Sequence, residues 1–354
     1  MRIVSLVWQK RAKLSSDQKG RPQKTYAVNV KKTSMVVSFY SKFESRLLIV
    51  TAIMLIAILF TVSAAKGATP KRAELTVVGS TNVWKMQSSD GAGSFSAVEW
   101  GLPGDVRVPA DYDGDGIKDI AVWRPSNGNW YVLRSSDGMI WQLQWGQPTR
   151  SSKDIQDIPV PADYDGDQVD DIAIWRPTDS RWYVLTSKTG FYPSRASISE
   201  WGKFGDIPVP ADYDGDGKTD AAVFRSTQDR WYVAQSKTGD LDVRKFGIAG
   251  KDVLVPADYT GDGRADLAVF RSGVWYVQDS TTHETERFEF GFADSKPVPA
   301  DYDGDGTTDF AAYRQGTWYI FDSGTPRLRS FRFGRDGEVP LTSLSVKPSI
   351  VAAN

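Results

Sequence analysis

The chain has 354 residues, 40% hydrophobic and 25% charged, as in one large globular domain or two small ones. It has no Cys and one His, His283, which excludes disulfides, thiolate chemistry and sites built on several histidines of one chain. Residues 1–46 hold 11 Lys/Arg and 2 Asp/Glu and residues 47–65 hold no charge, so in a chain of net charge −1 the remainder carries −10. An acidic body argues against nucleic acid as a partner, because phosphate binding needs a basic surface.

The first segments of the chain predict export. A basic polar segment (1–46) precedes an uncharged apolar run (47–65), which ends in small residues typical of a signal-peptide cleavage site. The run is also just long enough to span a bilayer as an uncleaved anchor. We favour cleavage, and both interpretations place the rest of the chain in the medium or on the cell surface. A translation start at Met35 would shorten the basic segment to an ordinary n-region.

After a short linker (66–72), the chain repeats itself. Five segments of the type VPADYDGDGxxDxAxxR follow one another at steps of 52, 49, 46 and 43 residues. A period of this length is typical of a propeller blade. The segments begin at Val108, Val160, Val209, Val255 and Val298.

Each repeat predicts four short strands, because β-branched and aromatic residues alternate with turn residues. Strand a is the VPA segment, strand b follows the acidic loop, and strand c is the aromatic WYV run, such as 130–132. Strand d ends in an aromatic-Gly pair, such as Trp145-Gly146. No sustained helical period occurs after residue 66, so the predicted fold class is all-β.

The two ends of the repeat region complement each other. Residues 73–90 align with strands b and c of a repeat, and 98–101 supply strand d. The missing strand a is offered by 337–343, near the carboxyl end. We therefore predict a β-propeller over 73–345 with six blades, closed between its termini, and a tail at 346–354. Seven blades are the alternative, since propellers with 4 to 8 blades occur.

The acidic loops carry the chemistry. In the first loop, aspartates fall at positions one, three, five and nine, and the backbone carbonyl of position seven is available. Calcium takes six to eight oxygen ligands, and the spacing matches the first nine positions of an EF-hand loop. The acidic twelfth position of that loop is missing, so the Asp at position nine must complete the shell. Asp/Gly turns that merely cap hairpins are the alternative, which five matching loops disfavour.

Two loops depart from the pattern. Loop two has Gln168 where the others have Gly at position six, and a non-Gly residue with positive φ costs about 1 kcal/mol. Loop four has Thr260 at position three and therefore one carboxylate fewer. We expect weaker calcium binding at both.

The aromatic-Gly pairs, the DxDGDGxxD loops and their spacing resemble the FG-GAP and VCBS repeats of integrin-α-like, calcium-binding propellers of bacterial type. The resemblance covers about 73–343 and implies about five Ca²⁺ ions between strands a and b. The ligands that it implies are Asp111, Asp113, Asp115, Ile117 and Asp119; Asp163, Asp165, Asp167, Val169 and Asp171; Asp212, Asp214, Asp216, Lys218 and Asp220; Asp258, Thr260, Asp262, Arg264 and Asp266; and Asp301, Asp303, Asp305, Thr307 and Asp309.

A ligand site is expected on the face opposite to the acidic loops, where the connections vary most. The longest is Gln147–Ile158, with Arg150 and Lys153. The Arg that ends each strand b is expected to support its own blade by a salt bridge or aromatic stacking, rather than to bind a ligand. The Trp of each strand c is expected to pack between blades. His283 is expected to be solvated.

These observations favour a monomeric surface or secreted module that binds a glycan or an extracellular protein without catalysis. A structural scaffold without a dedicated ligand is the first alternative. A calcium-assisted polysaccharide lyase, or an accessory domain of one, is the second. No catalytic group stands out, because every recurring polar residue has a structural explanation and an active site should break the repetition.

Overall fold

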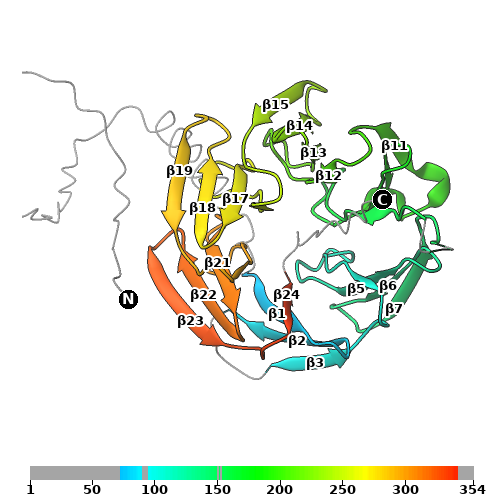
Figure 1. The fold of residues 1–354 in the computed structure, drawn as a ribbon. Helices are drawn as coiled ribbons and strands as arrows, with labels where there is room; N and C mark the ends of the chain where they lie inside the picture. Colours follow the sequence, from blue (N-terminus) through cyan, green and yellow to red (C-terminus); the bar gives the residue numbers. More distant parts are fainter. Residues whose placement is uncertain (1–71, 90–94, 150, 152–153, 342–354) are drawn as a thin grey trace, which may run out of the picture. The chain divides into compact units, whose positions relative to one another are not determined.

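The computed structural model describes residues 72–89, 95–149, 151 and 154–341, which all belong to one compact unit of the chain. They form six four-stranded antiparallel sheets around a common centre, which is a six-bladed β-propeller (Figure 1). The predicted signal peptide or anchor (47–65) and tail (346–354) lie outside the described residues. No helix in the described part of the chain is long and apolar enough to cross a membrane.

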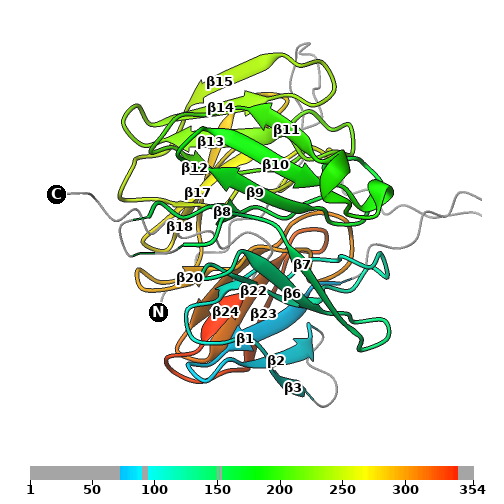
Figure 2. The same ribbon diagram turned by 90° about the vertical axis from the view of Figure 1, so that its right-hand side faces the viewer.

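Each sheet is one blade, in which strand a pairs with b, b with c and c with d, and successive strands run in opposite directions (Figure 2). Blades one to five each use four consecutive strands. Blade one is β4 (Val106–Arg107), β5 (Ile120–Arg124), β6 (Asn129–Leu133) and β7 (Ile140–Gln144); blade two is β8 (Ile158–Pro159), β9 (Ile172–Arg176), β10 (Arg181–Leu185) and β11 (Ser197–Glu200); blade three is β12 (Ile207–Pro208), β13 (Ala221–Arg225), β14 (Arg230–Ala234) and β15 (Leu241–Lys245); blade four is β16 (Val253–Leu254), β17 (Leu267–Arg271), β18 (Val274–Gln278) and β19 (Thr285–Glu289); and blade five is β20 (Lys296–Pro297), β21 (Phe310–Arg314), β22 (Thr317–Asp322) and β23 (Arg327–Arg332). Two short 3-10 helices, Ser187–Thr189 and Pro193–Arg195, lie between β10 and β11.

Blade six joins the two ends of the repeat region, as predicted. Its strand a is β24 (Val339–Leu341), and strands b to d are β1 (Glu74–Val78), β2 (Val83–Ser88) and β3 (Ser96–Glu99). β24 pairs antiparallel with β1, with Val339 opposite Val78. This pairing closes the ring at six blades and removes two unpaired blade edges.

Strand a lies two residues earlier than predicted. In blade one it is Val106–Arg107 rather than the VPA segment at 108–110. Pro109 has no N–H to donate, so the regular ladder stops before it. The chain nevertheless stays beside strand b, because Val108 N donates to Ala121 O (2.9 Å) and Ala110 forms a bridge with Asp119. The same shift occurs in blades two to five.

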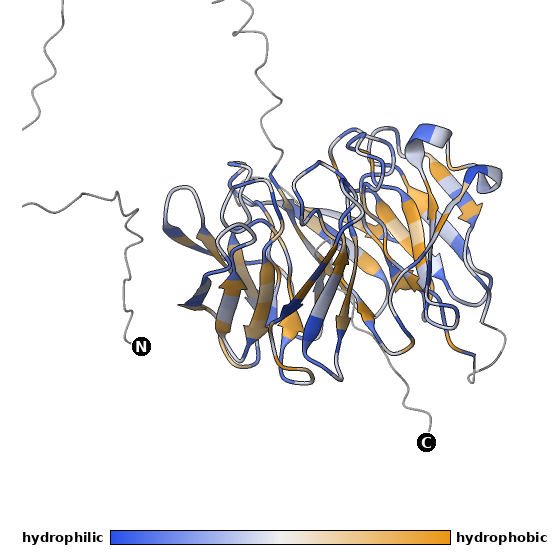
Figure 3. Ribbon diagram, turned by 90° about the horizontal axis from the view of Figure 1, so that it is seen from above, coloured by the Kyte–Doolittle hydropathy of each residue, from blue (hydrophilic) through white to orange (hydrophobic). Residues whose placement is uncertain are grey.

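The core lies between adjacent blades. Each strand b is buried over nearly its whole length, as expected for a strand covered on both faces, whereas strand d alternates between exposed and half-buried positions. Five of six clusters of buried side chains combine residues of two neighbouring blades; one of them, for example, contains Trp123 of blade one and Ile174 of blade two. The sixth cluster lies in blade four and packs against the partly buried Phe310 of blade five. The apolar residues therefore gather within the sheets, and the connections at both ends are hydrophilic (Figure 3).

The Trp of strand c packs in the core, as predicted. Trp130 is fully buried, and its Nε1 donates to the carbonyl of Trp145 in the aromatic-Gly pair (2.8 Å). The Trp residues at this position in the other five blades bond in the same way. Gly146 must follow, because its φ is +116° and a Cβ there would lie 3.1 Å from the ring of Trp123. The aromatic-Gly pair thus ties strand d to strand c.

Candidate metal centres

The five acidic loops connect strands a and b, and each position-one aspartate shapes its own loop. Asp111 Oδ1 accepts from Gly114 N (2.7 Å), and Asp111 Oδ2 accepts from Gly116 N (2.6 Å). The same two bonds recur in the other four loops. In loop two the second donor is Gln168, whose φ is +69°, so the predicted positive φ at this non-Gly residue is confirmed.

The position-nine aspartate links the loop to the turn between strands c and d. Asp119 is 1% exposed; its Oδ2 accepts from Tyr112 N (2.9 Å) and its Oδ1 from Ser135 N (2.7 Å). The other four blades repeat both bonds, with Ser187, Ser236, Ser280 and Ser323 as the turn donors. This serine was not among the predicted site residues, although it recurs at a fixed distance after the Trp of strand c. We call the face that carries these loops and turns the acidic face.

Burial makes the charge at position nine costly. It raises the pKa of Asp171 to about 7, and those of Asp119, Asp220, Asp266 and Asp309 to about 6, although two backbone N–H groups oppose the shift in each case. Neighbouring aspartates of the same loop raise these pKa values further. A bound cation would compensate this concentration of negative charge.

In four loops, three carboxylates bring one oxygen each within 4.8 Å of one another. The groups are Asp111, Asp113 and Asp115; Asp163, Asp165 and Asp171; Asp212, Asp214 and Asp220; and Asp301, Asp303 and Asp309. Loop four forms no such group among the described residues, consistent with Thr260 at its position three. Positions one, three and nine therefore converge in loops two, three and five, and positions one, three and five converge in loop one.

Position three offers free oxygen atoms in two of these groups. Both carboxylate oxygens of Asp165 and Oδ1 of Asp214 are buried without a hydrogen bond. Lys188 Nζ lies 3.5 Å from Asp165 Oδ1, which is an ion pair beyond good hydrogen-bonding geometry. Buried carboxylate oxygens are rarely left without partners. Unpartnered oxygens beside two further carboxylates fit a hard cation such as Ca²⁺.

The carboxylate at position five, also a predicted ligand, is hydrogen-bonded to the turn serine in three of the convergent loops. In loops two, three and five this carboxylate accepts from the turn serine: Ser187 Oγ donates to Asp167 (2.7 Å), Ser236 Oγ to Asp216 (3.0 Å) and Ser323 Oγ to Asp305 (3.4 Å). The position-seven carbonyl faces the same hydroxyl in loops one and five, at 3.4 Å from Ser135 Oγ and Ser323 Oγ. The turn serine thus bonds predicted ligands at positions five and seven, which do not belong to most of the groups of three converging carboxylates.

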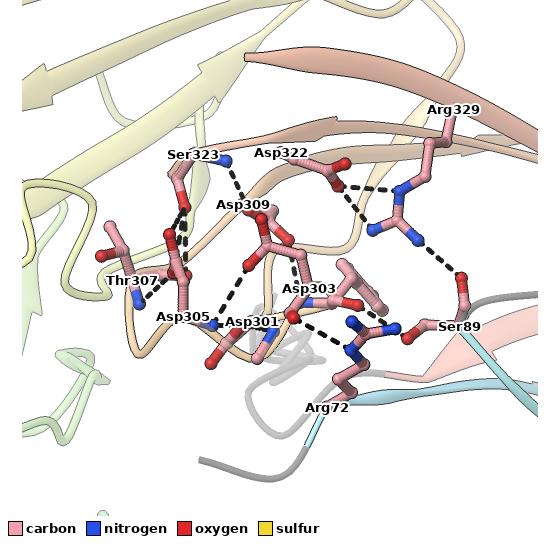
Figure 4. A network of polar contacts seen from close by, with 12 residues as sticks. Arg72, Ser89, Asp301, Asp303, Asp305, Thr307, Asp309, Asp322, Ser323 and Arg329 are labelled. Carbon is pink, nitrogen blue, oxygen red and sulfur yellow. Dashed lines mark hydrogen bonds and ion pairs between the residues drawn. The ribbon is translucent and has the colours of Figure 1, made fainter. Parts of the chain in front are cut away.

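Figure 4 shows how loop five meets the closing blade. Arg72 Nε donates to Asp303 O (2.9 Å), and Ser89 Oγ donates to Tyr302 O (2.7 Å). Arg329 pairs with Asp322 and also donates to Ser89 O (2.7 Å). Blade six has no acidic loop, because its strands a and b, β24 and β1, come from opposite ends of the repeat region. These contacts fasten its edge to loop five.

The acidic loops are also joined to one another. The position-one carbonyl of each of loops one to four accepts from the position-eight N–H of the next loop, as in Asp170 N to Asp111 O (2.7 Å). Loop five continues the series through Ala73 N to Asp301 O (2.7 Å). Gly114 lies under the side chain of Val169 in the next loop, and with φ +77° a Cβ there would approach Val169 Cγ2 to 2.9 Å. The candidate metal centres therefore form one connected row.

The b–c turns and the d–a connections form the other face, which we call the connection face. As predicted, the Arg after strand b supports its own blade: Arg225 pairs with Asp206 through two bonds (2.8 and 2.7 Å) and lies 4.1 Å from the ring centre of Tyr232. Equivalent pairs are Arg124–Asp105, Arg176–Asp157 and Arg271–Asp252, and in blade five Arg314 pairs with Asp294. Arg150 and Lys153, predicted near a ligand site on this face, lie outside the described residues.

Comparison with known proteins identifies the repeats. A family model described as an FG-GAP-like repeat matches residues 111–174, 163–223 and 212–269; each match starts at a position-one aspartate and extends into strand b of the next blade. No curated protein matches the chain. Similar solved structures include an Agrocybe aegerita lectin that recognises non-reducing terminal N-acetylglucosamine (16% identity, 74% of this chain and 90% of that chain covered, TM-score 0.49). Another is virginiamycin B lyase from Staphylococcus aureus (10% identity, 75% and 87% covered, TM-score 0.44). Neither likeness bears on function.

Proposed function

Because the chain is an FG-GAP repeat β-propeller protein, we propose that it is an exported calcium-binding module that binds a glycan or an extracellular protein without catalysis. Calcium would occupy the acidic loops and hold each loop to its blade. The connection face would carry the recognition site. The protein would act in the medium or at the cell surface, as the apolar run at 47–65 predicts.

The observation that carries the proposal is the convergence of carboxylates around unpartnered oxygens. In loop three, Asp212, Asp214 and Asp220 approach one another while Asp214 Oδ1 has no hydrogen bond. Three anionic groups in one small volume repel one another unless a cation separates them. Ca²⁺ suits the donors, which are all oxygen, and extracellular calcium is abundant enough for sites of modest affinity.

Calcium has a structural task in this proposal. Position one shapes the loop, position nine holds the c–d turn, and the loop carbonyl bonds the next blade. An ion among these carboxylates would connect all three. When bound, it would supply positive charge and oxygen coordination, while the chain's own residues hold the fold.

A binding role is favoured over catalysis by how the recurring polar groups are used. The Arg of strand b is engaged with Asp and an aromatic ring in blades one to five. A lyase would need a base in an open site. His283, the single histidine, lies exposed in the c–d turn of blade four, away from the connection face.

The test is a glycan-array screen of the protein in mild detergent, run with millimolar calcium and again with a chelator. The proposal expects selective binding that is lost on chelation. A folded, calcium-loaded protein that binds no glycan, and captures no cell-surface protein in a pull-down, would leave a scaffold role. Release of unsaturated sugar from a polysaccharide, followed by ultraviolet absorbance, would contradict the non-catalytic assignment.

A further inference from the structure

Two adjoining hollows mark blade three on the connection face. The first has a volume of about 370 Å³ and is lined by Gln228, Arg230 and Lys245. The second, of about 280 Å³, lies between the d–a connection at 203–206 and the b–c turn, and includes Arg225 and Gln228. Gln228 lines both hollows, so they form one continuous surface.

The first hollow contains a like-charge pair. Arg230 at the start of strand c lies directly opposite Lys245 at the end of strand d. Like charges at opposed positions of an antiparallel pair are destabilising. Neither cation has an acidic group within 4.0 Å among the described residues, and both are exposed. The fold therefore keeps two uncompensated positive charges side by side.

No other blade repeats this arrangement. The equivalent opposed pairs are Asn129–Gln144, Arg181–Glu200, Val274–Glu289, Thr317–Arg332 and Val83–Glu99. In blade two the pair is a salt bridge of 3.7 Å, so the same positions can hold opposite charges. Blade three therefore differs from the other five blades at this position, and its surface is hollowed at the same place.

The second hollow adds a third cation and an exposed ring. Lys203 is exposed and has no acidic partner within 4.0 Å among the described residues, and Phe204 beside it is 67% exposed. Arg225 contributes no free charge, because Asp206 pairs with it. The nearby carboxylate of Asp229 accepts from Ala249 N (2.8 Å). The surface as a whole favours anions and offers an apolar platform.

We infer that this surface, formed by Lys203, Phe204, Gln228, Arg230 and Lys245, binds an acidic polysaccharide. The inference rests on the proposed function and names its ligand class. Carboxylate or sulfate groups would pair with the three cations, and the guanidinium of Arg230 can bind such a group through two bonds. The apolar face of a sugar ring would pack on Phe204. Two connected hollows suit consecutive sugar units.

The test compares two charge reversals. Lys245→Glu would give Arg230 the opposite charge that Arg181 already has in blade two, so this variant should fold and melt no lower than the unmodified protein. Arg332→Glu makes the same charge change at the equivalent position of blade five and serves as the control. Binding is measured to polygalacturonate, which carries carboxylates, to dextran sulfate and to neutral dextran.

We expect Lys245→Glu to weaken binding to at least one anionic polymer by roughly tenfold or more, the value of one charged contact, while Arg332→Glu changes it less than about twofold. Phe204→Ala should weaken the same binding without changing its salt dependence. Preference for polygalacturonate or for dextran sulfate then identifies the anionic group.

Three results would overturn the inference. The two charge reversals could weaken binding equally, which would indicate unspecific attraction. Lys245→Glu could leave anionic binding unchanged. The folded, calcium-loaded protein could bind neither anionic polymer. If the protein binds neutral glycans in a calcium-dependent way but neither anionic polymer, this site is refuted while the proposed function stands.

Discussion

The acidic face and the connection face use charge in opposite ways. On the acidic face, carboxylates accept backbone N–H groups in all five loops, yet buried oxygens of Asp165 and Asp214 have no hydrogen bond. On the connection face, the repeated charges are paired, as in Arg225 with Asp206, and the uncompensated ones include the non-repeated Lys203, Arg230 and Lys245. Excess negative charge that repeats suggests an ion needed by each of the five blades with an acidic loop, whereas excess positive charge at one blade suggests recognition.

Removal of calcium should have the largest effect, because it acts on every loop of the acidic face. One site stabilises the folded state by about 2.7 kcal/mol when calcium exceeds its dissociation constant a hundredfold. With several sites emptied, we expect the melting temperature to fall by more than about 10 °C. Calorimetry with calcium and with a chelator measures the shift. An equal melting temperature in both would show that the acidic face needs no ion.

Breaking one pair on the connection face should cost less than this. Arg225→Ala leaves Asp206, 2% exposed, as a buried unpaired charge, and we expect a loss of roughly 3–5 kcal/mol in the free energy of unfolding. Arg314→Ala is the matched control, since its partner Asp294 is 56% exposed and the pair should contribute about 0–1 kcal/mol. Urea denaturation of both variants in the presence of calcium measures the two losses in the free energy of unfolding. Equal losses would mean that burial of the partner does not set the cost.

Two single substitutions, one that removes a carboxylate from loop three and one that adds a carboxylate to loop four, test the acidic face in opposite directions. Asp214→Asn should lower stability in calcium by about 2–3 kcal/mol through loss of one site. In a chelator it should be neutral or stabilising, because a buried charge with an unpartnered oxygen disappears. Thr260→Asp should do the reverse and add calcium affinity at loop four. Thermal melts with and without calcium report both signs; a change of the same sign in both conditions would refute metal binding at these positions.

The smallest effect is expected at position six of loop two. Gln168 has a φ of +69°, so Gln168→Gly should stabilise the protein by about 0.5–1 kcal/mol and strengthen calcium binding there. Gly217→Gln is the reciprocal control in loop three, because its φ is +83° and no atom lies within 4 Å of a Cβ at that position. It should destabilise by about 1 kcal/mol. Unfolding midpoints that move in the same direction for both variants would contradict a backbone origin.

The sequence was informative for features that recur as a recognisable motif in the repeats. Acidic loops, aromatic-Gly pairs and the complementary ends predicted six closed blades, and the repeated Arg and Trp predicted their structural roles. Strand a was predicted two residues too late. The VPA segment recurs in all five repeats and therefore predicts the strand, although Pro109 interrupts the ladder.

Contacts between segments that lie apart in the sequence were harder to predict, both between repeats and within one blade. The bond from Asp170 N to Asp111 O joins two loops, and the position-nine aspartate bonds a serine in a distant turn of its own blade. Both depend on how strands and blades are placed, which residue spacing alone does not define. The opposition of Arg230 and Lys245 likewise depends on the register of β14 and β15. An alignment of the five repeats would have shown the serine, but not its partner.

The central claim is that the acidic loops hold calcium, and its most direct test is the amount of calcium that stays with the protein. The first step is elemental analysis of the protein after gel filtration in calcium-free buffer. The second is a calorimetric titration, in which calcium is added back to the protein after a chelator has emptied its sites. The account predicts several calcium ions per chain, up to one for each of the five loops, with the weakest binding in loops two and four. A folded protein that retains no calcium and releases no heat on titration would contradict it.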